Sequence, residues 1–240
     1  MTIIRFDSLE STNRYCEALD LNQVEDFTCY WALQQTAGIG QRGNHWESSS
    51  GLNLTFSLVL HPDFLPASEQ FRLTQMLSLA LSDCLRSLDL PKPIHIKWPN
   101  DIYVGNDKIC GILVSNRLQG EHITASICGI GLNVNQTDFP SWVPNPVSLL
   151  SLTGKQFELE ALLQQLLDHI AQRYHSLRLG NNLLPEYLVQ LLRIGIPAEY
   201  RYRGCTISAT IKGVDPFGHL LLVDEANREL VCGMKEISYI

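Results

Sequence analysis

The sequence predicts an α+β fold, in which a mainly antiparallel sheet with helices is followed by a small β-barrel. The first observation is that short apolar runs rich in β-branched and aromatic residues recur between residues 2 and 134, with helical patterns between them. The second is that strands and helices do not alternate strictly, as a doubly wound parallel sheet would require. The third is that residues 195–240 alternate apolar and polar side chains between closely spaced turn signals.

The expected elements of the first part follow in chain order. Strands are predicted at residues 2–6, 28–34, 52–60, 94–98, 102–104, 108–115 and 122–134. The first helix begins near Ser11 and Thr12, whose hydroxyls are suited to an N-cap. Residues 70–88 have the pattern of one long buried helix, and residues 156–178 carry leucines at helical spacing. We assign all these elements to a first domain, residues 1–194.

A change of composition after residue 194 marks a second domain, residues 195–240. A Gly-Ile-Pro turn at 195–197 opens it, and turn signals at 203–204 and 215–218 divide it into short strands. A sheet of this size is only marginally stable by itself. We therefore expect it to pack on the first domain.

Composition limits the function classes. The chain has 240 residues and a mass of 27.0 kDa, and its 45% apolar and 18% charged residues are typical of a globular protein. The formal net charge of -7, without a long basic run, argues against a nucleic-acid partner. Because no apolar stretch has the length of a membrane span or the flanks of a signal peptide, we expect a cytoplasmic protein without membrane contact.

The cysteines are odd in number, are never spaced as CxxC and mostly lie within apolar runs. Their spacing fits neither a zinc site nor a disulfide framework. We expect reduced thiols that fill the core as small hydrophobic residues. They are Cys16, Cys29, Cys84, Cys110, Cys128, Cys205 and Cys232.

Three glycines and an arginine precede a tryptophan in the stretch TAGIGQRGNHW, residues 36–46. Gly38, Gly40 and Gly43 free the backbone to bend tightly and to bring its N–H groups close to an anionic ligand. The stretch does not lead into a helix, as a dinucleotide fingerprint must. A surface loop that merely contains several glycines is the alternative.

A second stretch, KWPND at residues 97–101, is expected to end a strand, because Pro99 cannot donate to a ladder. Asn100 and Asp101 would then lie at the end of the strand. Lys108 follows a hairpin turn and shares strand parity with Cys110, so that it heads an apolar face. In the alternative, Lys108 extends into water, and Asn100 and Asp101 satisfy turn and backbone groups.

The third stretch, GIGLNVN at residues 129–135, ends a strand with two glycines and places Asn133 and Asn135 on one face. Gly129 and Gly131 would permit the close approach of a ligand. An Asn-rich turn after a strand is the alternative.

Taken in order, STN (11–13), GxGQRGxxW (38–46), KWPNDI (97–102), KxxGIL (108–113) and GIGLNVN (129–135) resemble the motifs of the biotin protein ligases. The resemblance implies a class II synthetase-like catalytic domain followed by an SH3-like barrel. It indicates the short form without an N-terminal DNA-binding domain, since strand-like residues begin at position 2. It also implies that biotin and Mg²⁺-ATP give biotinyl-5'-AMP and pyrophosphate, after which biotin passes to a lysine of a biotin carboxyl carrier protein.

The resemblance also assigns roles to residues. Lys108 would contact the biotin carboxylate and the α-phosphate, and Asp101 would accept a proton from the incoming lysine amine. The predicted catalytic residues are Lys108, Asp101 and Arg42. The predicted biotin-binding residues are Ser11, Thr12, Asn13, Gln35, Gly38, Gly40, Lys108 and Gly111. The predicted nucleotide-binding residues are Trp46, Arg42, Lys97, Asn100 and Asn133, with Mg²⁺ bound through the ATP phosphates.

One departure from the family pattern concerns the glycine-rich loop. Many family members read GRGRxxRxW, whereas this chain has Ile39 and Gln41 in place of two arginines. We hypothesise that Arg42 and the loop N–H groups carry more of the anion binding, and that biotinyl-AMP is held less tightly.

Two alternative functions remain open. A lipoate or octanoate transferase shares the superfamily fold, but those proteins lack the KWPND string and their ligands offer no ureido group to Ser11 and Thr12. A non-catalytic biotin-binding module would explain the missing loop arginines, but Lys108, Asp101 and Trp46 speak against it. Whatever the function, exposed strand edges in the main sheet would allow a symmetric homodimer.

Overall fold

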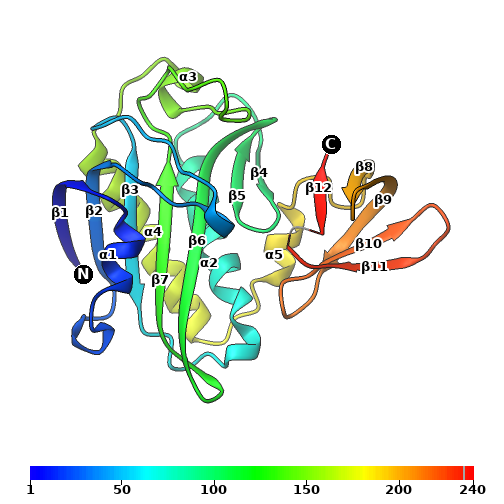
Figure 1. The fold of residues 1–240 in the computed structure, drawn as a ribbon, viewed down its shortest axis with the longest axis horizontal. Coiled ribbons are helices and arrows are strands. Elements are labelled where there is room, and N and C mark those ends of the chain that lie inside the picture. Colours follow the sequence, from blue (N-terminus) through cyan, green and yellow to red (C-terminus); the bar gives the residue numbers. More distant parts are fainter. Residues whose placement is uncertain (235) are drawn as a thin grey trace.

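The computed structural model describes residues 1–234 and 236–240, and the side chains of these residues except that of Arg42. The larger part of the chain forms a seven-stranded sheet with the order β1-β2-β3-β7-β6-β5-β4 (Figure 1). All neighbouring strands are antiparallel except β1 and β2, so the prediction of a mainly antiparallel sheet is confirmed. The strands are β1 Thr2–Leu9, β2 Thr28–Gln35, β3 Leu54–Leu60, β4 Ile94–Lys97, β5 Asp101–Val104, β6 Asp107–Gln119 and β7 His122–Leu132.

The two long helices lie on one face of this sheet. In Figure 1, α2 and α4 pack on each other behind the sheet, and the short helix α1 lies in front of it, against β3 and β7. The buried helix predicted at 70–88 is α2, and the pattern at 156–178 forms α4. The α-helices are α1 Thr12–Glu17, α2 Phe71–Arg86, α3 Leu149–Thr153, α4 Leu159–Arg178 and α5 Leu184–Val189. Short 3₁₀ helices are η1 Leu21–Gln23, η2 Gln41–Gly43 and η3 Ala67–Glu69. None of the helices in the described residues is both long and apolar enough to cross a membrane.

The centre of the core lies at β3, because the sheet is covered there on both faces. Every residue of β3 is buried, which agrees with its almost continuous apolar sequence LTFSLVL. The two polar residues in this strand are Thr55 and Ser57. The hydroxyl of Thr55 donates to the backbone of β2, whereas Ser57 contacts side chains at the start of α1. Ser57 therefore lies under the α1 face of the sheet.

The C-terminal residues form a second, five-stranded sheet with the order β11-β10-β9-β8-β12. Its strands are antiparallel, but within the described residues β11 and β12 remain unpaired edges, so the predicted closed barrel is wrong and the sheet is open. The edge strands are only four and three residues long, which leaves few backbone groups for a further ladder. The strands are β8 Pro197–Tyr202, β9 Cys205–Val214, β10 Leu220–Asp224, β11 Glu229–Cys232 and β12 Ile237–Tyr239.

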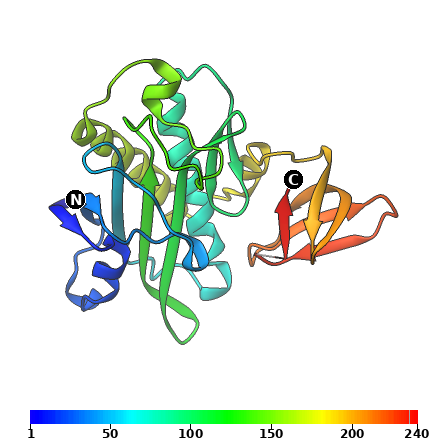
Figure 2. The ribbon, with the colours of Figure 1, turned by 45° about the horizontal axis from the view of Figure 1, so that its top comes forward.

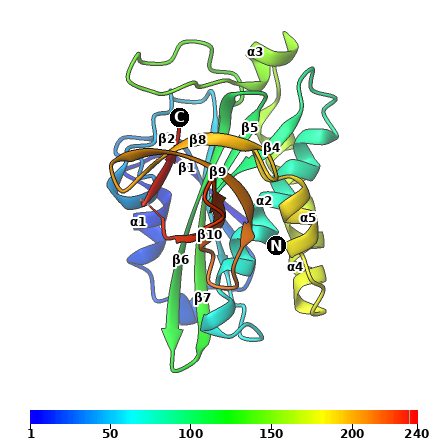
Figure 3. The same cartoon turned by 90° about the vertical axis from the view of Figure 1, so that its right-hand side faces the viewer.

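The small sheet lies beside α5 and the β4–β5 hairpin (Figure 2, Figure 3). The indole N–H of Trp98, which is buried, donates to the Gly218 carbonyl at 3.0 Å. The ammonium of Lys97 lies 4.8 Å from the ring centre of Tyr103 and 5.1 Å from that of Tyr239. The KWPN segment at the end of β4 is thus one place where the small sheet contacts the first part of the chain.

Six of the seven cysteines are buried, as predicted, and the prediction is wrong for Cys205, which is exposed. Cys205 begins β9 directly after the turn at 203–204, where the chain is at the surface.

Candidate active site

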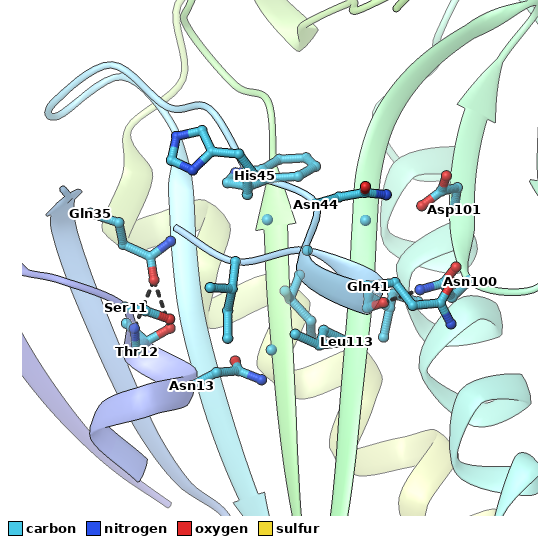
Figure 4. A pocket seen from close by; sticks show the side chains of 18 of the residues that line it. Ser11, Thr12, Asn13, Gln35, Gln41, Asn44, His45, Asn100, Asp101 and Leu113 are labelled. Carbon is cyan, nitrogen blue, oxygen red and sulfur yellow. Dashed lines mark hydrogen bonds between the residues drawn. The ribbon is translucent and has the colours of Figure 1, made fainter. Parts of the chain in front are cut away.

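A cavity of about 130 Å³ opens on the α1 face of the large sheet, between the start of α1, the loop after β2 and strands β5 to β7 (Figure 4). Most of the residues predicted to bind a ligand line this one cavity, although they come from segments far apart in the sequence. They are Ser11, Thr12, Asn13, Gln35, Gly40, Trp46, Asn100, Asp101, Lys108 and Gly111.

Other predicted residues lie elsewhere. Asn133 lines a neighbouring cavity, and Lys97 lies against the C-terminal sheet. Gly38 allows two parts of the loop to pack closely, since a Cβ there would lie 2.6 Å from the backbone oxygen of Trp46. Arg42 was predicted as a catalytic and nucleotide-binding residue, but its side chain lies outside the described part of the structure.

One side of the cavity is a wall of hydrogen-bonded polar side chains. The Oε1 atom of Gln35 accepts from the backbone N–H of Thr12 at 2.7 Å and from the Thr12 hydroxyl at 3.1 Å. The Ser57 hydroxyl lies 2.8 Å from that of Thr12 and donates to Oδ1 of Asn13 at 2.6 Å. Because a backbone N–H can only donate, the Gln35 oxygen is fixed toward Thr12, and the NH₂ end of Gln35 is directed toward the cavity (Figure 4).

Three buried polar atoms that face this cavity have no hydrogen-bond partner among the described residues: Ser11 Oγ, Asn13 Nδ2 and Trp46 Nε1. Ser11 occupies the N-cap of α1 as predicted, but its hydroxyl makes no cap hydrogen bond. Leaving a buried polar group unpaired costs about 1–3 kcal/mol. A polar ligand in the cavity would recover this cost.

Glycines of β6 and β7 form the floor of the cavity. A Cβ built on Gly131 would lie 2.3 Å from the Trp46 ring, and one built on Gly111 would lie 3.0 Å from it. A Cβ on Gly129 would lie only 2.0 Å from Oδ1 of Asn13. Because these positions lack side chains, Trp46 and Asn13 can contact the strand backbone directly.

Asp101 lies on the side of the cavity opposite the polar wall (Figure 4), and it forms an ion pair with Lys108. The Lys108 ammonium is 2.7 Å from Oδ1 of Asp101, and both side chains are partly buried. A register shift between β5 and β6 leaves both Ile109 and Cys110 in the core, so the predicted shared parity of Lys108 and Cys110 is wrong. This bulge turns Lys108 toward the cavity, where its ammonium lies 5.6 Å from the centre of the Trp46 ring.

The glycine-rich loop after β2 folds back on itself over the cavity. The backbone N–H of Trp46 donates to Gly38 at 3.0 Å, and that of Gly40 donates to Asn44 at 2.7 Å. The tip is η2, Gln41–Gly43. These hydrogen bonds hold Trp46 in position over the cavity.

A second cavity of about 540 Å³ adjoins the first and shares Trp46 and Lys108 with it. It is also lined by Asn133, which is buried, and by Trp142, whose ring centre is 5.9 Å from that of His45. His45, Trp142 and Ser57 were not among the site residues predicted from the sequence. Trp142 could have been noticed as an isolated aromatic residue in a proline-rich stretch, whereas Ser57 carries no signal in the sequence.

Two asparagines hold backbone around these cavities. Asn100 donates its side-chain amide to the carbonyl of Ile112 and accepts from the backbone N–H of Ile112 at 3.0 Å, which ties the end of β4 to β6. Asn133 donates to the carbonyl of Val147 at 3.1 Å, which holds the segment before α3 against the second cavity. The side-chain N–H groups of both residues are thus engaged with the chain itself.

Burial lowers the pKa of Lys97, and its neighbours Lys108 and Arg193 lower that pKa further, whereas Asp101 raises it. The ammonium donates to the hydroxyl of Tyr103 at 3.1 Å. Lys97 therefore lies close to the charges of the active-site cavity while it contacts the C-terminal sheet.

The chain is similar to known proteins along most of its length. A family model described as the biotin/lipoate A/B protein ligase family matches residues 5–133. The bifunctional ligase/repressor BirA of Bacillus subtilis is 30% identical over 229 residues, covering 92% of this chain and 69% of that protein. The biotin–[acetyl-CoA-carboxylase] ligase of Paracoccus denitrificans is 30% identical, covering 84% of this chain and 87% of that protein.

Among solved structures, the biotin protein ligase from Aquifex aeolicus in complex with biotin and ATP superposes with a TM-score of 0.80 and 25% identity, covering 99% of this chain and 97% of that one. The fold and these relatives define the class of this protein as a protein ligase of the biotin and lipoate type. The chain belongs to the biotin/lipoate A/B protein ligase family.

Proposed function

We propose that the chain is a biotin protein ligase, which joins biotin to a specific lysine of a biotin carboxyl carrier protein at the expense of ATP. The observation that carries this proposal is the construction of one cavity, with unpaired polar atoms at one wall and the Lys108–Asp101 pair on the opposite side. Such a cavity suits a molecule that has a ureido ring at one end and a carboxylate at the other. The names and bound ligands of the relatives support the same conclusion.

In the first step, a carboxylate oxygen of biotin would attack the α-phosphorus of ATP, and the bond to the β-phosphate would break to release pyrophosphate. Both reactants are anionic, so the site must hold them together and offset their repulsion. Lys108 would do this from its position between the two cavities, with the ammonium directed at the biotin carboxylate and the α-phosphate. Mg²⁺ would enter with the ATP phosphates and offset more of their charge.

In the second step, the lysine amine of the carrier would attack the carbonyl carbon of biotinyl-5'-AMP, and AMP would leave. The attacking nitrogen must lose a proton, and Asp101 would accept it, since its carboxylate lines the cavity in which the anhydride would be held. Trp46 would stack on the adenine. Folding of the glycine-rich loop over the cavity would exclude water from the mixed anhydride.

We propose a catalytic domain of residues 1–194 and an SH3-like domain of residues 195–240 that is open on one side. The protein would act in the cytoplasm without nucleic acid or membrane. The free edge of β1 would allow a homodimer.

The first experiment is pyrophosphate exchange into ATP, without carrier, with biotin and separately with lipoate as the acid. Exchange with biotin alone is expected, because the polar wall offers partners to a ureido group that lipoate lacks. Exchange with lipoate alone would show that the chain is a lipoate ligase and not a biotin ligase. No exchange with either acid would indicate a binding module without catalysis.

A further inference from the structure

Gln136 is a buried side chain directly after the GIGLNVN stretch, and the proposed reaction gives it no role. Only 2% of its surface is exposed, so its amide has little access to water. Burying an amide costs free energy unless its hydrogen bonds are made within the protein. Gln136 makes three, and they join the two segments that form the walls of the second cavity.

The orientation of the Gln136 amide follows from its backbone partners. The backbone N–H of Ser49 can only donate, and it lies 2.9 Å from the Oε1 atom of Gln136. The backbone carbonyl of Asp138 can only accept, and it lies 2.8 Å from the Nε2 atom. If the amide turned over, both contacts would bring like groups together. Each end of the Gln136 side chain therefore has one position.

Asn53 is oriented in the same way and extends this network. Its Oδ1 atom accepts from the backbone N–H of Val134 at 2.8 Å, so Nδ2 is the end that donates to Oε1 of Gln136, at 2.6 Å. The same Nδ2 donates to the hydroxyl of Ser48 at 3.2 Å. Asn53 is only 1% exposed. The two amides thus form a connected buried network, which favours a single arrangement of the backbone around it.

The network lies where the two walls of the second cavity begin. The first wall is formed by residues 43–47, which are followed closely by Ser49. The second wall lies within residues 139–146, which come directly after Asp138. Gln136 therefore links the two walls at their base.

Two backbone contacts cross the same base, but both lie before Gln136 in the chain. The N–H of Val134 donates to Asn53, and the N–H of Asn135 donates to the carbonyl of Leu52 at 2.7 Å. They hold the residues that follow β7, and not the residues that line the cavity. Among the described residues, Gln136 thus makes the hydrogen-bonded contact across the base that is nearest to the second wall.

The far end of the second wall is held by Lys108. The backbone N–H of Lys108 donates to the carbonyl of Asn145 at 2.7 Å, and that of Val147 donates to the carbonyl of Lys108 at 3.0 Å. Residues 139–144 therefore span two fixed points, one at Lys108 and one at Gln136. Without the Gln136 hydrogen bonds, this span would keep its attachment to Lys108 but would lose its attachment to the first wall.

We propose that Gln136 is a positioning residue for the nucleotide: it fixes the distance between the two walls of the second cavity, and so makes this cavity fit ATP. This inference rests on the proposed biotin ligase function, in which Lys108 reaches the α-phosphate from the border of both cavities. Gln136 lines neither cavity, so its effect would pass through the walls that it joins. Residues 137–146 do not line the first cavity, so biotin binding should change much less than ATP binding.

The test replaces Gln136 by methionine, which is also long and unbranched but has no amide. In biotin-dependent pyrophosphate exchange, Gln136→Met should raise the KM for ATP about 10-fold, because the variant loses the hydrogen bonds that set the spacing of the walls. The KM for biotin and the rate at saturating ATP should stay close to the wild-type values. Amide hydrogens within residues 137–144 should exchange faster with solvent than in wild type.

The matched control is Asn135→Leu. Asn135 is the neighbouring buried amide, and its side chain forms two hydrogen bonds with the backbone of Phe157, at 2.8 and 3.0 Å. Phe157 lines neither cavity. This variant should lose comparable stability and keep the wild-type KM for ATP. A raised KM for ATP in Gln136→Met but not in Asn135→Leu supports the inference.

An unchanged KM for ATP in Gln136→Met, an equal increase in both variants, or equal increases in the KM values for ATP and biotin would overturn it. If Gln136→Met does not fold, Gln136→Asn provides the second variant. Its amide is too short to reach both Ser49 and Asp138, so the same increase in the KM for ATP is expected, and an unchanged value would again overturn the inference.

Failure of the proposed function looks different, because wild type itself would then support no biotin-dependent exchange. The hydrogen exchange of residues 137–144 requires no activity and still tests the link in that case. Equal protection of these amides in wild type and Gln136→Met would show that Gln136 does not hold the second wall.

Discussion

Lys108 is the residue on which the proposed chemistry depends most directly. Its ammonium lies 2.7 Å from Asp101 and borders both cavities. Lys108→Ala should lower pyrophosphate exchange by about 10²–10³, because one donor to the developing charge at the α-phosphate is lost. Lys155→Ala, at an exposed lysine far along the chain, should retain full exchange.

Asp101 allows the two chemical steps to be separated. If its role is to accept the amine proton, Asp101→Asn should form biotinyl-5'-AMP and transfer it slowly to the carrier. Full exchange by Lys108→Ala, or unimpaired transfer by Asp101→Asn, would contradict the roles given to these two residues.

Gly131 is a residue whose importance comes from the absence of a side chain. Since a Cβ there would lie 2.3 Å from the Trp46 ring, Gly131→Ala should displace the indole and weaken ligand binding while the sheet stays folded. The change should appear in the fluorescence of Trp46, which is identified by comparison with Trp46→Phe. Gly213→Ala, where the nearest side-chain atom is 4.0 Å away, should have neither effect.

Ile39 tests the hypothesis about the missing loop arginines. Ile39 lines the cavity, so an arginine there would place a cation next to the bound intermediate. Ile39→Arg should release biotinyl-AMP more slowly than wild type, as measured by a chase with unlabelled biotin and ATP. Equal release rates would reject the hypothesis that this loop holds the intermediate less tightly.

The sequence could predict which residues gather at the site where a short motif fixes the local backbone. Ser11, Trp46 and Asp101 are in such motifs, and the fold brings them to one cavity. Ser57 could not be predicted, because its environment depends on the packing of β3 under α1 and not on its neighbours in the chain. The side of the sheet to which Lys108 points also could not be predicted. A single-residue bulge places its side chain on the opposite face from the one that strict alternation along the strand implies.

At the scale of elements, the long amphipathic patterns were the most predictable. α2 and α4 lie within the predicted ranges, because in each range many apolar residues recur at the spacing of one helix face. The N-cap at Ser11 was placed correctly, but its hydroxyl does not cap α1. A propensity describes what a side chain usually does in a turn, and here the Ser11 hydroxyl faces a cavity instead.

The end of β4 joins the two parts of the chain through Trp98. Its buried indole N–H donates to Gly218 at 3.0 Å, and Trp98→Phe would leave this carbonyl unsatisfied at a cost of about 1–3 kcal/mol. We expect faster proteolysis within residues 195–240 and a lower Tm, with the first part of the chain still resistant. Trp142→Phe, at a tryptophan that is 57% exposed, should leave stability unchanged, and equal effects of the two variants would contradict a docking role for Trp98.

At the scale of the whole molecule, the fold class was predictable and the closure of the small sheet was not. The alternating pattern of residues 195–240 specifies strands, but it does not specify whether the two edge strands are long enough to pair. The position of this sheet against the KWPN segment depends on contacts such as Lys97 with Tyr239, which join residues distant in the sequence.

The buried thiols make the stability of the whole molecule depend on alkaline pH. Burial raises the pKa of Cys16, Cys84 and Cys128 from 9.0 to about 12. In the unfolded chain these thiols ionise near pH 9, whereas in the native protein they keep their protons. Their contribution to the free energy of unfolding is therefore complete below pH 9 and is lost as the pH rises from 9 toward 12, by up to about 1.4 kcal/mol per pH unit for each thiol.

Urea unfolding at pH 7.5, 9 and 10.5 should therefore show nearly constant stability up to pH 9 and a steep decrease above it. Because Cys205 is the exposed thiol, Cys205→Ser should follow the wild-type curve. A thiol reagent should modify one cysteine in the native protein at neutral pH and seven in urea, and the native protein should become reactive at further thiols only in the pH range where its stability falls. Stability that stays level to pH 10.5, or several thiols reacting at neutral pH, would show that these cysteines are not sealed in the core.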